Sequence, residues 1–225
     1  MAVENLEEWV QSQDDLVETF RRQGRFYEEH FPVVPNEYTN WIDELRATVE
    51  SCALADLSHH MTAVYIEGPD AIPFLKRLCV NDFDDFEVGQ AKQAILCNHD
   101  GDIMGDGPLL RLGEEKFHAP GIHATKWLRY NYEQGDYDIS LEIEPPTPLL
   151  PGDPEQFVYQ VQGPNAYDVL EKLTDDDLTD IGFYRFEDVT LAGMEMRALG
   201  HGMSPESGFE FHGPYEYADD LREAI

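Results

Sequence analysis

The chain carries one short pattern twice: an apolar strand, a Gly-Pro turn and the start of a helix. The copies lie at residues 64–78 and 159–173, and their identical residues stand 95 positions apart. Glycine permits a turn that other residues resist, and proline is tolerated in the first turn of a helix. Five identities at constant spacing predict a duplicated α+β unit, whereas the common occurrence of Gly-Pro turns is the simpler alternative. The identities are Gly68 and Gly163, Pro69 and Pro164, Ala71 and Ala166, Leu75 and Leu170, and Leu78 and Leu173.

The segment before the first copy is predicted to be a helical segment with a loop, spanning residues 1–62. Apolar residues recur at helical spacing in residues 4–22, with a break near 11–14, and again in residues 37–52. Two prolines in residues 31–36 exclude a helix there and predict an extended loop.

The Pro-rich residues 145–154 are the predicted boundary between the two α+β halves. We therefore expect a first half at residues 63–150 and a second half at residues 151–225. The last predicted helix runs to the final residue without a stop signal, which indicates that the chain is truncated. Strands are expected at 63–66, 94–97, 103–112, 188–191, 194–199 and 208–211, with a turn at 98–101 and helices at 123–134 and 214–225.

The net charge of the chain is −31, from 15 basic and 46 acidic residues spread along its length. Dispersed acidity with only five lysines favours a protein adapted to high salt, because screening removes the self-repulsion of such a charge. An ordinary acidic protein is the alternative. In either case the charge argues against nucleic acid and anionic membranes as partners.

Three cysteines, Cys52, Cys79 and Cys97, lie in apolar runs without a C-x-x-C motif. An odd number in this setting favours buried, reduced thiols. The sequence contains no run of 18 apolar residues, so no membrane-spanning helix is expected. The acidic N-terminus is unlike a signal peptide. These features together predict a cytoplasmic protein.

Several segments, taken in order, resemble the aminomethyltransferase family, whose best-known member is the glycine-cleavage T-protein. The resemblance covers about residue 31 to the end, and it is greatest to the tetrahydrofolate-dependent aromatic O-demethylases that act on vanillate- or syringate-like acids. It implies an aminomethyltransferase-like folate-binding fold without the family's C-terminal barrel, and tetrahydrofolate as the cofactor. The segments that carry the resemblance are residues 31–34, 40–41, 58–61, 66–71, 98–101, 105–107, 162–164, 208–210 and 213–216.

The resemblance implies that Glu210, in the Gly-Phe-Glu segment, binds the pterin ring of folate. A carboxylate can accept two parallel hydrogen bonds from the amidine-like edge of a pterin. Gln162 ends the strand before the second Gly-Pro turn, where its amide could reach the same ring. The alternatives are a surface strand residue at position 210 and a structural amide at position 162.

One departure from the T-protein concerns the loop at residues 101–107. The T-protein carries two adjacent aspartates there, of which the first is catalytic. Gly105 stands at that position, and Asp106 matches the second. The resemblance therefore favours demethylation over glycine cleavage, with Asp106 as a candidate catalytic carboxylate; its alternative role is to shape the turn.

The methyl-transfer reaction implied by the resemblance needs a donor near the departing ether oxygen, and histidine suits that role. His60 is the candidate catalytic donor, and His59 is a candidate substrate contact. Tyr27, Phe31 and Tyr38 could form an aromatic wall or belong to the core, with Phe31 as the candidate substrate contact. No further set of metal-ligand residues accompanies the histidine pair, so no metal site is predicted.

His123 lies in a segment where the resembling demethylases carry an arginine for the acid group of the substrate. We expect either that His123 takes this role or that the substrate is not a benzoate. The resulting hypothesis is a tetrahydrofolate-dependent methyltransferase that uses a small-molecule methyl donor. A glycine-cleavage-type aminomethyltransferase and a non-catalytic folate-binding protein or inactive fragment are the alternatives.

Overall fold

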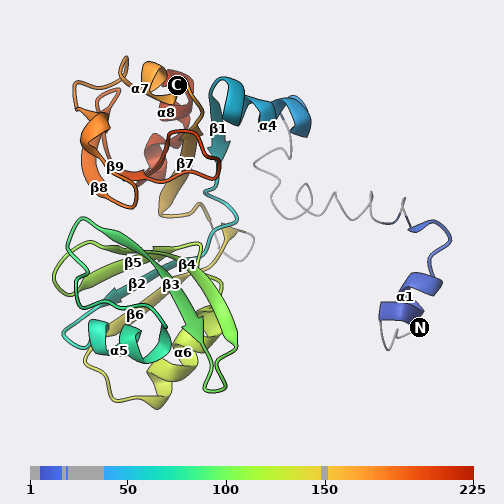
Figure 1. Cartoon of the computed structure of the whole chain (residues 1–225), viewed down its shortest axis with the longest axis vertical. Coiled ribbons are helices and arrows are strands. Elements are labelled where there is room, and N and C mark those ends of the chain that lie inside the picture. Colours follow the sequence, from blue (N-terminus) through green and yellow to red (C-terminus); the bar gives the residue numbers. More distant parts are fainter. Residues whose placement is uncertain (1–5, 17–18, 20–37, 148–151) are drawn as a thin grey trace. The chain divides into compact units, whose positions relative to one another are not determined.

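The structure is a computed structural model that describes residues 6–16, 19, 38–147 and 152–225 (Figure 1). The chain divides after Thr39 into two units, and both α+β halves lie in the second unit. The expected loop at residues 31–36 falls outside the described residues. In the described part, no helix is long and apolar enough to cross a membrane.

The helices and strands predicted from the sequence appear in the expected order, together with three strands that were not predicted and with short 3₁₀ helices labelled η. They are α1 (Leu6–Gln11), α4 (Trp41–Glu50), β1 (Ala53–Asp56), β2 (Ala63–Glu67), α5 (Ala71–Leu78), β3 (Ala91–Cys97), β4 (Ile103–Arg111), β5 (Lys116–Pro120), α6 (Thr125–Gln134), β6 (Ser140–Glu144), β7 (Gln156–Gln162), α7 (Ala166–Leu170), η2 (Leu178–Asp180), β8 (Phe186–Leu191), β9 (Met194–Gly200), β10 (Gly208–Pro214), η3 (Tyr215–Tyr217) and α8 (Ala218–Ala224).

Two open, five-stranded antiparallel sheets have matching strand orders, β6-β2-β5-β4-β3 and β1-β7-β10-β9-β8. In each sheet the Gly-Pro strand, β2 or β7, is the second strand from one edge. The α+β architecture expected from the sequence is therefore confirmed, and the described residues form no closed barrel.

The two Gly-Pro turns have the same geometry. Gly68 and Gly163 adopt φ values of 140° and 135°, which favour glycine. A Cβ on Gly68 would lie 2.3 Å from the carbonyl oxygen of Asp138, and one on Gly163 would lie 2.4 Å from that of Ser51. Both glycines therefore also permit a close backbone approach, which explains why the pattern appears twice.

The edge strand of the second sheet comes from a distant part of the sequence. β1 pairs with β7, with Ala53 opposite Gln162, although it precedes the whole first half. In the first sheet the matching edge strand, β6, follows β5 and α6. The half boundaries expected at residues 62 and 150 stay a prediction, but the second sheet includes a strand from before the first of them.

Each sheet buries one face against its helices. Figure 1 shows α5 and α6 against the first sheet, where they contribute Phe74, Leu75 and Leu128 to its buried core. Helices α7 and α8 contribute Leu170 and Leu221 to the core of the second sheet. The opposite faces meet at a small apolar cluster of Ala91, Leu110, Phe186 and Leu199. Backbone hydrogen bonds reinforce this junction, including Ala91 N to Tyr184 O at 2.8 Å and Phe186 N to Gly89 O at 3.0 Å.

Candidate functional site

Side chains alternate along β10 between the apolar core and the face that meets the other sheet. Phe209 and Phe211 enter the core. Glu210 and His212 lie on the opposite face and are each only 3% exposed. Buried carboxylate and imidazole groups are rare unless they are paired or functional, so this face is the candidate site.

Gln160 of β7 lies directly opposite Glu210 in the sheet. Its Nε2 atom donates to the carbonyl oxygens of His201 and Phe209, at 2.9 and 3.0 Å. These two bonds determine the orientation of the amide, because only its NH₂ end can donate. The other end, Oε1, is buried and has no hydrogen-bond partner among the described residues.

The carboxylate of Glu210 supplies a second buried acceptor beside Gln160. Its Oε1 atom is 2.9 Å from His212 Nε2, a contact without the geometry of a hydrogen bond. Burial raises the pKa of Glu210, but the contact with His212 and the charges of His212 and His201 hold it below its usual range. Glu210 is therefore ionised at neutral pH. Two buried acceptors without a hydrogen bond thus lie on neighbouring strands, and one of them, Glu210 Oε1, is in contact with His212.

Gln162 shares the face of Gln160, but protein groups engage both ends of its amide. Nε2 donates to Ser204 Oγ at 2.8 Å and to the carbonyl oxygens of Ser204 and Glu206 at 3.2 and 3.1 Å. Oε1 accepts from the amide of Met203 at 2.8 Å. Gln162 thus holds the loop at residues 203–206, and it is Gln160 that carries the orphaned acceptor. A contact between Gln162 and folate stays a prediction.

Asp106 is connected to the second half through two side chains. Its Oδ2 atom accepts from Gln93 Nε2 at 2.7 Å, and Gln93 Oε1 accepts from the hydroxyl of Tyr184 at 2.8 Å. Burial raises the pKa of Tyr184, and the charges of Glu210 and Asp106 raise it further. Because the charges of both carboxylates raise the pKa of Tyr184, Asp106 and Glu210 both lie near this tyrosine.

Position 105 has no room for a side chain. A Cβ on Gly105 would lie 2.9 Å from the amide nitrogen of Ala124 and 3.0 Å from its Cβ. A Cβ on Gly107 would lie 3.3 Å from the Cα atom of Ile122. The glycines let residues 122–124 pack against β4, which accounts for the absence of a carboxylate at position 105.

The three predicted histidines form a separate group. His59 is buried, with Nδ1 3.1 Å from Thr147 Oγ1 and Nε2 3.4 Å from the hydroxyl of Tyr215. The pKa of His60 is lowered, chiefly by burial. The charge of Asp56 raises this pKa, whereas the charges of His123 and His59 lower it further. His60 and His123 are exposed, and their segments are in contact, because Gly121 donates its amide to the Thr62 carbonyl at 2.8 Å.

Other predicted residues have different outcomes. Phe31 and Tyr27 lie outside the described residues, and Tyr38 is exposed. Within the described ranges, no group of three or more His, Cys, Asp or Glu residues could hold a metal ion. Gln160, Gln93 and Tyr184 were not predicted from the sequence as site residues. Only for Gln160 was a signal present, since the period of two along a strand places it on the face of Gln162.

Comparison with known proteins agrees with this architecture. The GCVT N-terminal domain matches residues 18–225. A syringate O-demethylase from Sphingobium sp. is 34% identical over 197 residues, which cover 87% of this chain and 43% of the relative. A sesamin methylene transferase from Sinomonas sp. is 34% identical over 188 residues, with coverages of 81% and 39%. An aminomethyltransferase from Thermoanaerobacter sp. is 31% identical over 198 residues, with coverages of 85% and 51%.

A solved structure shows the same fold. The crystal structure of the glycine cleavage system aminomethyltransferase T from Bartonella henselae superposes with a TM-score of 0.66 at 23% identity, over 81% of this chain and 47% of that chain. The chain spans about half or less of the length of the curated relatives described above. Because the domain match covers residues 18–225, which is most of the chain and the whole of the described α+β region, this chain belongs to the GCVT N-terminal domain family.

Proposed function

We propose that this chain supplies the tetrahydrofolate-binding part of a one-carbon transferase of the O-demethylase type, which moves a methyl group from a methoxy substrate to folate. The observation that carries the proposal is the pair of buried, orphaned acceptors, Gln160 Oε1 and Glu210 Oε1, on neighbouring strands. Family membership and the names of the first two relatives support the same reaction class.

The chemistry of the two acceptors fits a pterin. A pterin ring presents several N–H donors along one edge, and an ionised carboxylate accepts such donors in charge-assisted hydrogen bonds. The carbonyl oxygen of Gln160 offers an acceptor on the adjacent strand. Both groups are buried, so pairing them removes the cost of two unsatisfied polar atoms. In this proposal Gln162 keeps the 203–206 loop in place beside them.

Bound tetrahydrofolate supplies the nucleophilic nitrogen that receives the methyl carbon. The residues of this chain have the supporting roles. Glu210 and Gln160 orient the ring. His60 hydrogen-bonds the oxygen that leaves as a phenolate, and its lowered pKa makes it a readier proton donor when it is protonated. Asp106, held by Gln93, contacts folate or substrate, and His59, His123 and Phe31 are the proposed substrate contacts.

Calorimetric titration of tetrahydrofolate tests the binding role. Glu210→Gln, which removes the charge at nearly constant volume, should weaken binding by about 1.5–3 kcal/mol. Gln160→Leu should weaken it by about 1 kcal/mol. Glu216→Gln, at an exposed carboxylate of η3, is the matched control and should have no effect. Unchanged affinity in both site variants would remove the acceptor pair from the folate site.

The reaction itself is tested by NMR detection of methyl transfer. Methoxy-aromatic donors carrying a ¹³C-methyl group are incubated with tetrahydrofolate and either this chain or a longer protein that includes the following family domains. A new N-methyl signal supports the proposal. A methylene adduct would point to methylene transfer, and folate binding without turnover in either protein would favour a non-catalytic folate-binding role.

The setting of the protein is part of the proposal. The dispersed net charge of −31 supports a cytoplasm of high ionic strength. The same charge argues against nucleic acid as a partner. Measuring the unfolding temperature against salt concentration tests this setting independently of folate.

A further inference from the structure

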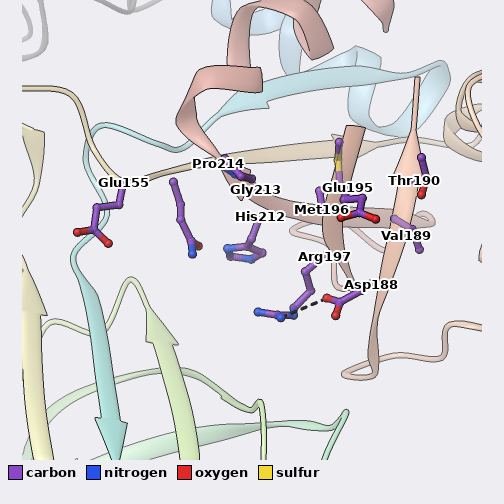
Figure 2. Close-up of a pocket in the computed structure, with 11 residues that line it drawn as sticks. Glu155, Asp188, Val189, Thr190, Glu195, Met196, Arg197, His212, Gly213 and Pro214 are labelled. Carbon is purple, nitrogen blue, oxygen red and sulfur yellow. Dashed lines mark ion pairs between the residues drawn. The ribbon is translucent and has the colours of Figure 1, made fainter. Parts of the chain in front are cut away.

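A cavity of about 550 Å³ opens on the second sheet at the end where β7 begins. Pro214 pairs with Gln156 at this end, whereas Gly208 pairs with Gln162 at the other. Figure 2 shows the His212 ring and the Arg197 guanidinium among the side chains that line the cavity, with Arg197 paired to Asp188. The cavity thus lies beyond His212, away from the loop that Gln162 holds.

Arg197 and His212 line this cavity, whereas His118 and Tyr65 line a second, smaller pocket. All four side chains carry buried polar atoms without a hydrogen-bond partner in the described part of the chain. The atoms are Arg197 Nε, both ring nitrogens of His212, His118 Nε2 and the hydroxyl oxygen of Tyr65. His118 is 2% exposed and His212 is 3% exposed. Buried polar groups are nearly always paired, so several unpaired ones together require a ligand or water.

These four side chains are neighbours, although they come from both sheets. The rings of His118 and His212 meet edge to face, with centroids 5.7 Å apart. Tyr65 stacks on His118 at 4.6 Å. Burial, His212 and Arg197 all lower the pKa of His118, which is consistent with Arg197 lying close to that ring, and Arg197 lies directly opposite His212 in the sheet.

The unpaired atoms are donors or can become donors. An arginine Nε always carries a hydrogen, a neutral imidazole donates from one nitrogen, and a tyrosine hydroxyl donates while protonated. Burial raises the pKa of Tyr65, so its hydroxyl keeps its proton. The Glu210–Gln160 pair presents acceptors, whereas this neighbouring group presents donors. The two groups therefore fit ligands of opposite hydrogen-bonding character.

Charge is distributed unevenly between the interior and the rim of the cavity. The Arg197 side chain is 22% exposed, whereas its partner Asp188 is 80% exposed. Glu155 and Glu195 also line the cavity and are exposed. Their charges disfavour a doubly charged anion at the rim, whereas the Arg197 guanidinium favours a single negative charge in the interior.

We propose that Arg197 and His212, with His118 and Tyr65 behind them, form a second ligand site that binds the carboxylate of a small monocarboxylic acid. The carboxylate accepts from Arg197 Nε and from His212 Nδ1, while His212 Nε2 faces Glu210. Its two oxygens provide enough lone pairs for this cluster of donors. The site does not depend on the proposed folate function, because its ligand is recognised by donors and the pterin by acceptors.

The test is a titration of the full chain, labelled in its histidine rings with ¹⁵N, with phenylacetate as the probe. Saturable shifts of the His212 and His118 ring signals are expected. Phenylacetamide, which has the same shape without the charge, should bind at least tenfold more weakly, and phenyl phosphate should not bind better than phenylacetate. Equal binding of the amide, or no saturable shift, would overturn the proposal.

Variants assign the site to these residues. Arg197→Gln should weaken phenylacetate binding at least tenfold, and Arg129→Gln, at an exposed arginine of α6, should change it less than twofold. Tyr65→Phe removes one hydroxyl while keeping the stacked ring, and should weaken binding two- to fivefold; it also serves if Arg197→Gln does not fold. Wild-type affinity in Tyr65→Phe and in any folded Arg197→Gln protein would overturn the assignment.

A final arm separates this site from folate. The phenylacetate titration is repeated with tetrahydrofolate at saturation and, in parallel, with tetrahydropteroate, which lacks the glutamate carboxylates. Unchanged phenylacetate affinity is expected in both. Competition by tetrahydrofolate alone would assign the donors to the glutamate tail of folate and overturn the proposal of a separate acid.

Discussion

The hydroxyl of Tyr184 donates a hydrogen bond to Gln93 Oε1 over 2.8 Å, and this bond joins the two sheets. Tyr184 precedes β8 in the second half, and Gln93 lies in β3 of the first. The other end of the Gln93 amide donates to Asp106. A tyrosine in one half thereby determines the orientation of an amide, and through it the position of a carboxylate, in the other half.

We expect Tyr184→Phe and Gln93→Leu to destabilise the protein by about 0.5–1.5 kcal/mol each, because each removes the same part-buried hydrogen bond. Urea unfolding of the single and double variants measures their coupling. The double variant should lose less stability than the sum of the single variants. Tyr130→Phe, at an exposed tyrosine of α6, is the control. Additive effects would show that the bond does not link the halves energetically.

Replacing Gln162 with leucine should release the loop at residues 203–206, because Met203, Ser204 and Glu206 lose their shared partner. A loss of about 1–3 kcal/mol in unfolding free energy is expected from the buried groups left unsatisfied. Hydrogen–deuterium exchange should rise in this loop above all. Gln134→Leu, at an exposed glutamine that ends α6, should leave the loop unaffected. Unaltered exchange in the loop would contradict the structural role of Gln162.

The two Gly-Pro turns should respond alike to substitution. Gly68→Ala and Gly163→Ala each add a Cβ that overlaps a backbone carbonyl, whereas Gly193 has φ 81° and open space around its Cβ position. Gly193→Ala therefore measures backbone strain alone. Each turn variant should be less stable than Gly193→Ala by about 1–3 kcal/mol, the cost of overpacking. Thermal unfolding of the three variants provides the measurement. If only one of Gly68→Ala and Gly163→Ala were less stable than Gly193→Ala, the two turns would not be equivalent.

Stability should fall with acidification partly through His118. Its pKa is well below the ordinary 6.5, first because of burial and then because of His212 and Arg197. The unfolded chain therefore takes up a proton below about pH 6.5 that the folded chain does not, and the stability of the folded state decreases as the pH falls through that range.

His118→Phe should reduce this loss while leaving other groups in place. Between pH 7.5 and pH 5 the wild-type protein should lose about 1–2 kcal/mol more unfolding free energy than the variant. Urea unfolding at intermediate pH values provides the measurement. His99→Phe, at the exposed tip of the β3–β4 hairpin, is the comparison. Parallel pH curves for the wild-type and His118→Phe proteins would exclude His118 as a source of the pH dependence.

Salt should stabilise the folded chain strongly. With a net charge of −31, self-repulsion acts over the Debye length, which shrinks from about 10 Å at 0.1 M to about 3 Å at 1 M salt. The unfolding temperature should rise steadily from 0.1 to 2 M KCl. Sodium acetate and KCl should act alike if screening is the cause. A flat salt response would favour an ordinary acidic protein.

Local patterns in the sequence were sufficient to predict many of the helices, strands and turns of the fold. The strand, turn and helix of each Gly-Pro unit, the hairpin around residues 98–101 and the helix α6 all depend on residues close together in the chain. Turn chemistry and periodicity report such neighbours directly. The four-residue strand β1 and the strands β5 and β6 were not predicted, since a short run without a clear alternation carries no comparable signal.

The sequence by itself determined which side chains share a strand face, including Gln160 with Gln162 and Glu210 with His212. Only the tertiary structure decided what each of them does. The loop at residues 203–206 hydrogen-bonds the amide of Gln162, whereas Gln160 Oε1 has no hydrogen-bond partner among the described residues. Strand β1, which precedes the first half in the sequence, forms the edge of the second sheet. These outcomes depend on contacts between residues 40 to 110 positions apart, which periodicity within a short window cannot encode.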